Sequence, residues 1–373
     1  MTPFDIEPNF AAEADIVVHE NEVPPHVGPE LDRLYGTLYS SLTYFHACAS
    51  LAGVSTYIAR RNRVPTAVFL YRREGTRLYV VNEGMRLEAA EVERFAHHMF
   101  AGSDPVDMII LHAVQMESRG VPLLQQRFFC AEDFIVTLPS TPQDYLARLG
   151  SSTRKNLKRH RNRVERDFPS FRHCIVERGD VDERLIREII ELSRARIAGK
   201  GISFGIDEDE TRNIIKLVQR SGAVLLATID GRLCGGTIMY RIGKNWISRV
   251  NAHDPAYDDY RLGMLCCYLA ICNAIESGAE HFHLGHSWYE YKTALLGELQ
   301  AFDHITLYRS RGALLRHAGT ATRTACKGYA LQANRWIVHR AATDKRFHWR
   351  VVGKMLAAWR AAKSQRASAL RVP

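Results

Sequence analysis

One block of the chain, residues 222–308, constrains the fold most because its expected elements follow one another in an informative order. Two apolar strand candidates are joined at Asp230-Gly231, a typical hairpin turn. In chain order, the block predicts strands at AVLLATID, CGGTIMYRI and NWISRVNAH, a loop at DPAYDDYRLG, an apolar helix over 264–277, a strand at HFHLG, a helical turn at WYEYKTALLG and a strand at DHITLYRS. The expected order of elements is therefore β-β-β-loop-α-β-α-β.

The preceding sequence predicts a second α/β unit and a helical entry into the block. Residues 1–27 have an irregular pattern, and residues 29–50 can form a helix. Short β-branched and aromatic runs then predict strands, among them VSTYIARR, TAVFLYRR, RLYVVNEG and DMIILHAV, with a helix near 87–100. Helices are also expected to begin at Thr141-Pro142, to span 151–168, to run from a cap at Asp180 through Ala198, and to span 207–221.

We therefore predict an α/β (α+β) chain with two lobes, each built on a mixed central sheet, and a basic helical C-terminal extension. The expected boundaries are 1–135 for the N-terminal lobe, 136–310 for the acyltransferase lobe and 311–373 for the tail. The 46% hydrophobic and 24% charged residues are typical of a globular protein and exclude a disordered or collagenous chain. No apolar run approaches the roughly 18 residues that predict a membrane span.

The cysteines and the acidic N-terminal residues indicate a cytoplasmic protein. The eight cysteines contain no CxxC pair, and residues 1–23 lack the apolar centre of a secretory signal. We interpret the cysteines as reduced thiols, mostly packed as small apolar side chains.

Positive charge is concentrated in the tail. From residue 309 onward there are 15 Lys or Arg residues and one acidic residue, Asp344, whereas the remainder has 35 basic and 40 acidic residues. In the last segment, Val352, Leu356 and Trp359 share one side of a predicted helix. The tail can therefore bind an anionic membrane surface, an acidic acyl-carrier protein or nucleic acid, or it can pack on the catalytic lobe.

The loop that enters the apolar helix is a candidate anion site. A helix N-terminus offers free backbone N–H groups and a positive dipole end, which suit a pyrophosphate. Gly263 would let the backbone approach the phosphates closely. The alternative interpretation is an ordinary loop followed by a helix start.

Four sequence pieces sharpen this interpretation, because together they resemble the GNAT-type acetyltransferases of the CelD-like group, which is associated with cellulose biosynthesis and related to the Fem-type aminoacyltransferases. The pieces are STRKNLKR from Ser152, GGTI from Gly235, RLGML from Arg261 and YKTALLG from Tyr291. They lie within residues 140–310, a little under half of the chain. The chain departs from the family pattern at Leu262, where a small residue or proline is usual, and keeps one glycine, Gly263, of the usual two.

The resemblance implies a donor site with acyl-CoA or acyl-phosphopantetheine as co-substrate and no permanently bound cofactor. A backbone N–H of the strand around residues 246–251 would polarise the thioester carbonyl. The implied donor-binding residues are Arg249, Val250, Asn251, Arg261, Leu262, Gly263, Met264 and Leu265.

Acyl transfer to an amine also needs a proton donor for the thiolate and a base for the amine. Tyr289 and Tyr291 are candidate donors, or core tyrosines, and Lys292 can hold an acceptor carboxylate or a donor phosphate, or lie on the surface. Among the histidines at positions 281, 283 and 286, His286 is the expected base, with Glu290 second. A structural histidine is the alternative, and no metal site is predicted because no Cys or carboxylate completes a familiar ligand pattern.

The predicted function is an N-acyltransferase that moves an acyl group from an acyl thioester to an amine of a small molecule, peptide or glycan precursor. A Fem-type transferase that uses aminoacyl-tRNA is the first alternative, since the basic stretch Arg154–Arg166 can contact tRNA or simply face solvent. The second is a non-enzymatic membrane- or nucleic-acid-associated binding protein on a GNAT scaffold. The expected location is the cytoplasm, with a peripheral position at the inner face of the membrane as an extension.

Overall fold

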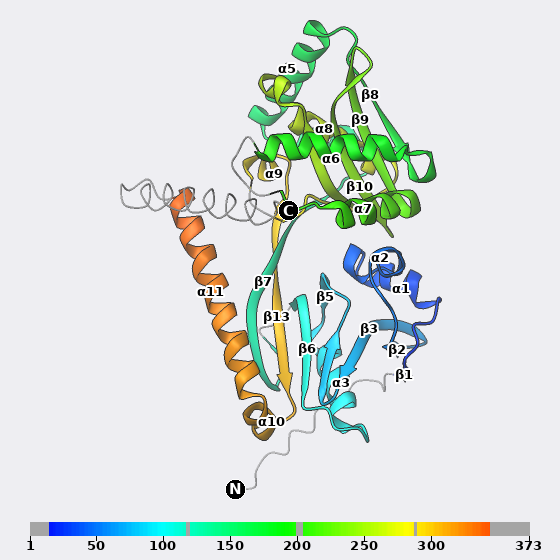
Figure 1. Ribbon diagram of the computed structural model, residues 1–373, viewed down its shortest axis with the longest axis vertical. Helices are drawn as coiled ribbons and strands as arrows, with labels where there is room; N and C mark the ends of the chain where they lie inside the picture. The colour runs from blue at the N-terminus through cyan, green and yellow to red at the C-terminus, as the bar shows by residue number, and fades with distance from the viewer. Residues whose placement is uncertain (1–14, 117–119, 199–203, 287–288, 344–373) are drawn as a thin grey trace, which may run out of the picture.

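The computed structural model describes residues 15–116, 120–198, 204–286 and 289–343. Its centre is one mixed sheet of 13 strands that runs through both lobes in the order β1-β2-β3-β4-β6-β13-β7-β12-β11-β10-β9-β8, with β5 beside β6 (Figure 1). The strands are β1 (Asp15–His19), β2 (Val54–Arg61), β3 (Val64–Glu74), β4 (Arg77–Val80), β5 (Met85–Leu87), β6 (Met108–Met116), β7 (Leu124–Thr137), β8 (Arg172–Glu177), β9 (Gly222–Ile229), β10 (Arg232–Ile242), β11 (Asn245–His253), β12 (His281–His283) and β13 (Glu298–Tyr308).

The helices cover both faces of this sheet. They are α1 (Val27–Leu34), α2 (Leu42–Cys48), α3 (Ala89–Ala101), α4 (Pro142–Arg148), α5 (Ser151–Asp167), α6 (Glu183–Ala198), α7 (Glu208–Ser221), α8 (Leu262–Glu276), α9 (Glu290–Ala294), α10 (Arg311–Arg316) and α11 (Ala318–Thr343), with short 3₁₀ turns η1 (Leu38–Ser40), η2 (Arg178–Asp180) and η3 (Pro255–Tyr260). In the C-terminal lobe, α4, α5 and α8 share one core with the sheet, and α6 and α7 share another on the opposite face.

The mixed α/β fold class is confirmed, and the block from β9 to β13 has the predicted order of elements. The two expected sheets are one continuous sheet, because the long strands β7 and β13 pair along their length and connect the lobes (Figure 1). The predicted lobe boundary at residue 135 falls inside β7, which the sequence analysis did not identify as a strand.

Two further expectations for the N-terminal region were wrong. Residues 15–19, within the stretch expected to be irregular, form β1 and pair with β2. The single helix expected over 29–50 is two helices, α1 and α2, because Gly36 has a φ of +56° and ends the first one. The second tail helix, with Val352, Leu356 and Trp359, lies outside the described residues.

Candidate active site

The sheet opens where β11 and β12 separate. These strands are parallel, but β12 pairs only with residues 245–247 of β11, and β11 continues to His253 beside β10. The β10–β11 pairing also shifts between Ile238–Val250 and Met239–Ser248, so Arg249 is the extra residue of a β-bulge. Bulges are common next to active sites because they redirect the backbone. The backbone N–H predicted to polarise a carbonyl lies within residues 246–251, and the part of this stretch after residue 247 has the open edge on one side and β10 on the other.

The first turn of α8 lies against the same part of β11. Arg261 caps the helix in the left-handed conformation, with a φ of +54°. The Asn251 Nδ2 atom donates to the Gly263 carbonyl at 2.9 Å, and a Cβ atom on Gly263 would lie 2.8 Å from His253 Nδ1. The structure therefore brings the two predicted donor-binding segments, 249–251 and 261–265, together. Val250, Leu262 and Leu265 are buried in the core, so only their backbone can serve a ligand.

Basic side chains of α5 surround this helix start. The Arg163 guanidinium lies over the Tyr260 ring at 4.7 Å, and it donates to the Asp259 carbonyl at 3.4 Å. The pKa of His160 is lowered by burial and by the neighbouring Arg159, Arg261 and Arg163. The helix start and the clustered cations together can bind an anion such as a phosphate.

The Tyr-Lys motif forms α9, which follows the open end of β12. Lys292 is 2% exposed, and its Nζ atom donates to the carbonyls of Gly285 and His286, each at 2.7 Å. Burial lowers the pKa of Lys292 to about 8. The ammonium therefore fixes the backbone that leaves β12, a contact that differs from the predicted grip on an acceptor carboxylate or donor phosphate.

The two tyrosines of the motif stack, with ring centroids 6.1 Å apart. Tyr289 is 45% exposed, whereas Tyr291 is half-buried, and burial raises the pKa of Tyr291 against the lowering effect of a hydrogen bond with Asn251. Tyr291 therefore keeps its proton at neutral pH and lies beside the donor-binding segments. Glu290 is exposed in the first turn of α9.

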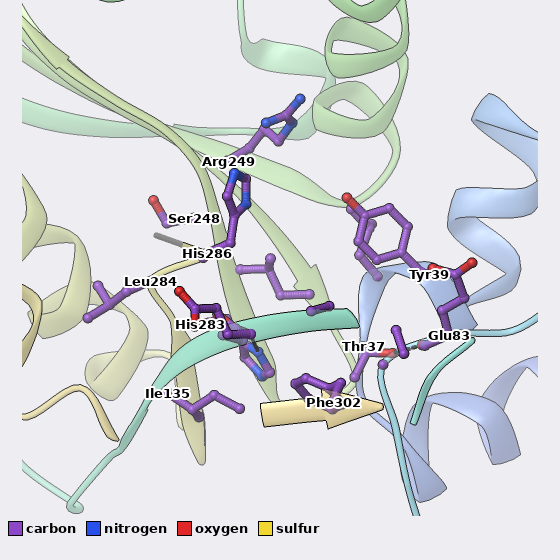
Figure 2. Close-up of a pocket in the computed structure, with 18 of the residues that line it drawn as sticks. Thr37, Tyr39, Glu83, Ile135, Ser248, Arg249, His283, Leu284, His286 and Phe302 are labelled. Carbon is purple, nitrogen blue, oxygen red and sulfur yellow. Dashed lines mark hydrogen bonds and ion pairs between the residues drawn. The ribbon is translucent and has the colours of Figure 1, made fainter. Parts of the chain in front are cut away.

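A cleft of about 2960 Å³ lies between the lobes, and Tyr289, Tyr291 and Lys292 line it. His286 and Arg249 enter it from the C-terminal lobe, and Tyr39 and Glu83 face them from the N-terminal lobe (Figure 2). The Arg249 guanidinium is paired with Glu210 at 2.6 Å, so its side chain is already engaged. Burial, with Lys292 and Arg249 nearby, lowers the pKa of His286.

Sequence reasoning missed Tyr39, Glu83 and Asp133, all of which line the cleft. Asp133 lies on β7 and binds His283 Nδ1 at 2.6 Å. The acidic pair Glu132-Asp133 inside an otherwise apolar stretch was the one available signal for Asp133. Within the described residues, no group of three or more His, Cys, Asp or Glu side chains is placed to hold a metal ion.

The geometry of this site agrees with the comparison to known proteins. Residues 151–293 match the family model described as acetyltransferase (GNAT) domain. This segment is similar in sequence to a GNAT acetyltransferase domain. The match supports the predicted acyltransferase rather than the non-enzymatic alternative, and it contains α5, the open edge of β11, α8 and the Tyr-Lys motif.

Among solved structures, FemX has a similar fold, with a TM-score of 0.53 and 8% identity over 78% of this chain and 96% of FemX. L-PGS from Bacillus licheniformis has a TM-score of 0.43 and 14% identity, covering 82% of this chain and 97% of its own. A tandem GNAT protein from the clavulanic acid biosynthesis pathway has a TM-score of 0.39 and 11% identity, covering 80% and 99%. No curated protein matches the chain in sequence. None of the helices in the described part of the chain combines the length and apolar character needed to cross a membrane.

Proposed function

We propose that this protein is an N-acyltransferase that moves an acyl group from an acyl thioester, either acyl-CoA or an acyl-carrier protein, to an amine of a small molecule, peptide or glycan precursor. The observation that carries the proposal is the separation of β11 and β12 beside the first turn of α8. There, the unpaired edge of a bulged strand adjoins a helix N-terminus, and a large cleft provides room for an acceptor. A CelD-like relationship fits the same motifs.

The residues at the start of α8 fit the phosphates of a CoA or phosphopantetheine donor. The first amides of the helix, those of Leu262 and Gly263, have no acceptor within the described part of the chain, and a donor phosphate can take their hydrogen bonds. Arg261 and the basic residues of α5 add positive charge, while the half-buried Met264 offers apolar contact.

The reaction needs a proton for the departing thiolate and stabilisation of the carbonyl oxygen. Tyr291 suits the first task, because it retains its proton and lies between the donor segments and the cleft. The backbone N–H groups of 249–251 suit the second task, since donors fixed in place stabilise the developing charge without reorganising.

Mass spectrometry of small molecules that copurify with the full chain tests the donor class. We expect acyl-CoA or acyl-phosphopantetheine, and we expect the protein to release free thiol from acetyl-CoA when primary amines are added. Absence of CoA binding by calorimetry, together with no thiol release across acyl-CoA and acyl-carrier donors, would contradict the proposal.

Aminoacyl-tRNA is the second candidate donor, favoured by α5. This helix places seven basic residues against one acidic residue between positions 154 and 166, directly beside the candidate donor site. The similarity to FemX concerns the fold and adds no information on the donor. Loss of activity after ribonuclease treatment, with no response to CoA thioesters, would favour this alternative.

We further propose that the basic tail brings the enzyme to an anionic membrane surface at the inner face of the membrane, or to an acidic acyl-carrier protein. Within residues 311–343, α10 and α11 carry six Lys or Arg side chains and no acidic one. Three large apolar side chains on them, Leu315, Tyr329 and Trp336, are each more than half exposed.

A further inference from the structure

A carboxylate–imidazole pair faces the cleft next to the open edge of the sheet. Asp133 on β7 and His283 on β12 lie on paired strands, and His283 Nδ1 is 2.6 Å from Asp133 Oδ2. Both residues line the cleft, and the His283 side chain is 8% exposed (Figure 2). The neighbouring Phe282 points into the core around α8, so alternation along the strand turns His283 to the opposite side.

The contact with Asp133 determines which ring nitrogen of neutral His283 carries the proton. An ionised carboxylate only accepts hydrogen bonds, so Nδ1 carries the proton and Nε2 keeps its lone pair. Nε2 makes no hydrogen bond to another described residue, and it is not one of the buried polar atoms without a partner, so it reaches the cleft. The second oxygen, Asp133 Oδ1, is buried and has no hydrogen-bond partner among the described residues, so His283 is the side chain that this carboxylate contacts directly.

The two other histidines nearby lack this arrangement. His281 Nδ1 is 3.2 Å from the Asn245 amide oxygen, a neutral partner. The ring of His286 makes no hydrogen bond within the described residues, and the adjacent cations of Lys292 and Arg249 oppose its protonation. Of the three imidazoles, His283 is therefore the one that a carboxylate contacts directly among the described residues.

We propose that the Asp133–His283 pair is the base that takes the proton from the acceptor's ammonium, with His283 Nε2 accepting the proton and Asp133 as the positioning residue. This inference rests on the proposed acyl transfer from a thioester. The ammonium gives one proton to Nε2, and the neutral amine attacks the thioester carbon. The C–N bond forms and the C–S bond breaks; Tyr291 protonates the departing sulfur and regains a proton from the attacking nitrogen, and Nε2 returns its proton to solvent.

Kinetics of the full chain test this role, with acetyl-CoA as donor, a panel of primary amines as acceptors and free thiol as the readout. We expect His283→Gln to lower kcat/KM by about 10²–10⁴-fold, the usual contribution of a positioned base. Asp133→Asn should lower it too, because the imidazole loses the carboxylate that accepts its Nδ1 hydrogen bond. His281→Gln is the matched control on the same strand and should lower kcat/KM far less than His283→Gln does.

Several charged or titratable groups line the cleft together with His283. They are Glu132 and Asp133 on β7, Lys292 on α9, Arg249 on β11, His281 on β12 and Glu83 across the cleft. Salt screens such charges, so Asp133→Asn is compared with the wild type at one ionic strength. A larger loss in His286→Gln than in His283→Gln would overturn the proposal.

Nitrogen-15 NMR of the histidine-labelled full chain tests the pair without any substrate. We expect neutral His283 to carry its proton on Nδ1, and Asp133→Asn to shift this population toward Nε2–H. A predominant Nε2–H form in the wild type would overturn the proposal even if the enzyme is active. If the wild type releases no thiol with any donor, the proposed acyl transfer fails. The NMR result then decides separately whether neutral His283 carries its proton on Nδ1.

Discussion

Lys292 is almost inaccessible to solvent, and within the described residues its ammonium has no carboxylate in salt-bridge contact. It instead donates to two backbone carbonyls at the end of β12. Burial outweighs the favourable effect of Asp133 and brings the pKa of Lys292 down to about 8. Because this value lies inside the range of ordinary assays, the charge of Lys292 changes where activity can be measured.

We predict an alkaline limb in kcat near pH 8, since Lys292 is protonated below its pKa of about 8 and neutral above it. Lys292→Met should lower kcat by about 10²-fold by removing the group that holds residues 285–286. Lys292→Arg keeps the charge at every assay pH, so its profile should lose the alkaline limb. Steady-state kinetics between pH 6 and about 10 measure the profiles of the wild type, Lys292→Met and Lys292→Arg. A flat wild-type profile would refute the prediction.

Tyr291 is predicted to supply the proton for the leaving thiolate. Tyr291→Phe removes the hydroxyl and keeps the ring, so kcat should fall by about 10²-fold or more while the melting temperature changes little. Tyr289→Phe is the matched control, because the Tyr289 ring is more exposed and stacks on Tyr291. Equal effects of the two substitutions would show that the stacked pair acts through packing.

At the scale of elements, the first turn of α8 depends on close contact with β11. A Cβ atom on Gly263 would lie 2.8 Å from His253 Nδ1, which is shorter than a van der Waals contact. Gly319 occupies the equivalent second position of α11, and a Cβ atom there meets nothing within 4 Å. The two glycines therefore offer a matched comparison of a packed and an open helix start.

We predict that Gly263→Ala destabilises the protein by about 1–3 kcal/mol, the usual cost of overpacking, and weakens binding of acetyl-CoA. Gly319→Ala should leave the stability unchanged or raise it slightly, because alanine favours helix. Denaturant unfolding and calorimetric titration with CoA provide the two measurements. Normal CoA binding by a correctly folded Gly263→Ala variant would place the donor elsewhere.

The elements that the sequence predicted are those whose signals are local. The Asp230-Gly231 turn, with φ values of +52° and +73°, joins β9 to β10 as expected. Strand β7 was missed because most of its residues are partly exposed, so no alternation of apolar and polar positions forms. Its Glu132 and Asp133 face a cleft whose opposite wall, Tyr39 and Glu83, comes from the other lobe, and only the assembled fold brings these residues together.

At the scale of the whole molecule, α11 runs beside β7 and is attached at several points (Figure 1). Arg316 and His317 bind the buried Asp107 at 2.8 and 3.3 Å. Further along, Gly328 packs on Phe128, where a Cβ atom would clash with the ring, and Arg335 lies over the Phe129 ring at 4.1 Å. The side of α11 that contacts β7 is therefore part of the fold, as expected if the tail packs on the body of the protein. The opposite side of α11 remains available for a partner.

Arg323 and Lys327 lie one turn apart on α11 and are exposed, so they form a basic pair suited to an anionic membrane surface. We predict that the full chain sediments with vesicles containing phosphatidylserine, and not with phosphatidylcholine vesicles. The double variant Arg323→Glu/Lys327→Glu should bind at least about 30-fold more weakly, because each basic residue near such a surface contributes about 1 kcal/mol. Binding should also weaken in 1 M salt, where the Debye length falls to about 3 Å.

Lys216→Glu/Arg220→Glu on the exposed side of α7 makes the same change in net charge on another element, so it separates local contact from overall charge. If both double variants lose binding equally, the attraction comes from the net charge of the protein and not from α11. If vesicles of either kind leave the wild type in solution while an acidic acyl-carrier protein binds it, the basic pair on α11 serves the carrier. A wild type that ignores both would restrict α11 to holding the two lobes of the sheet together.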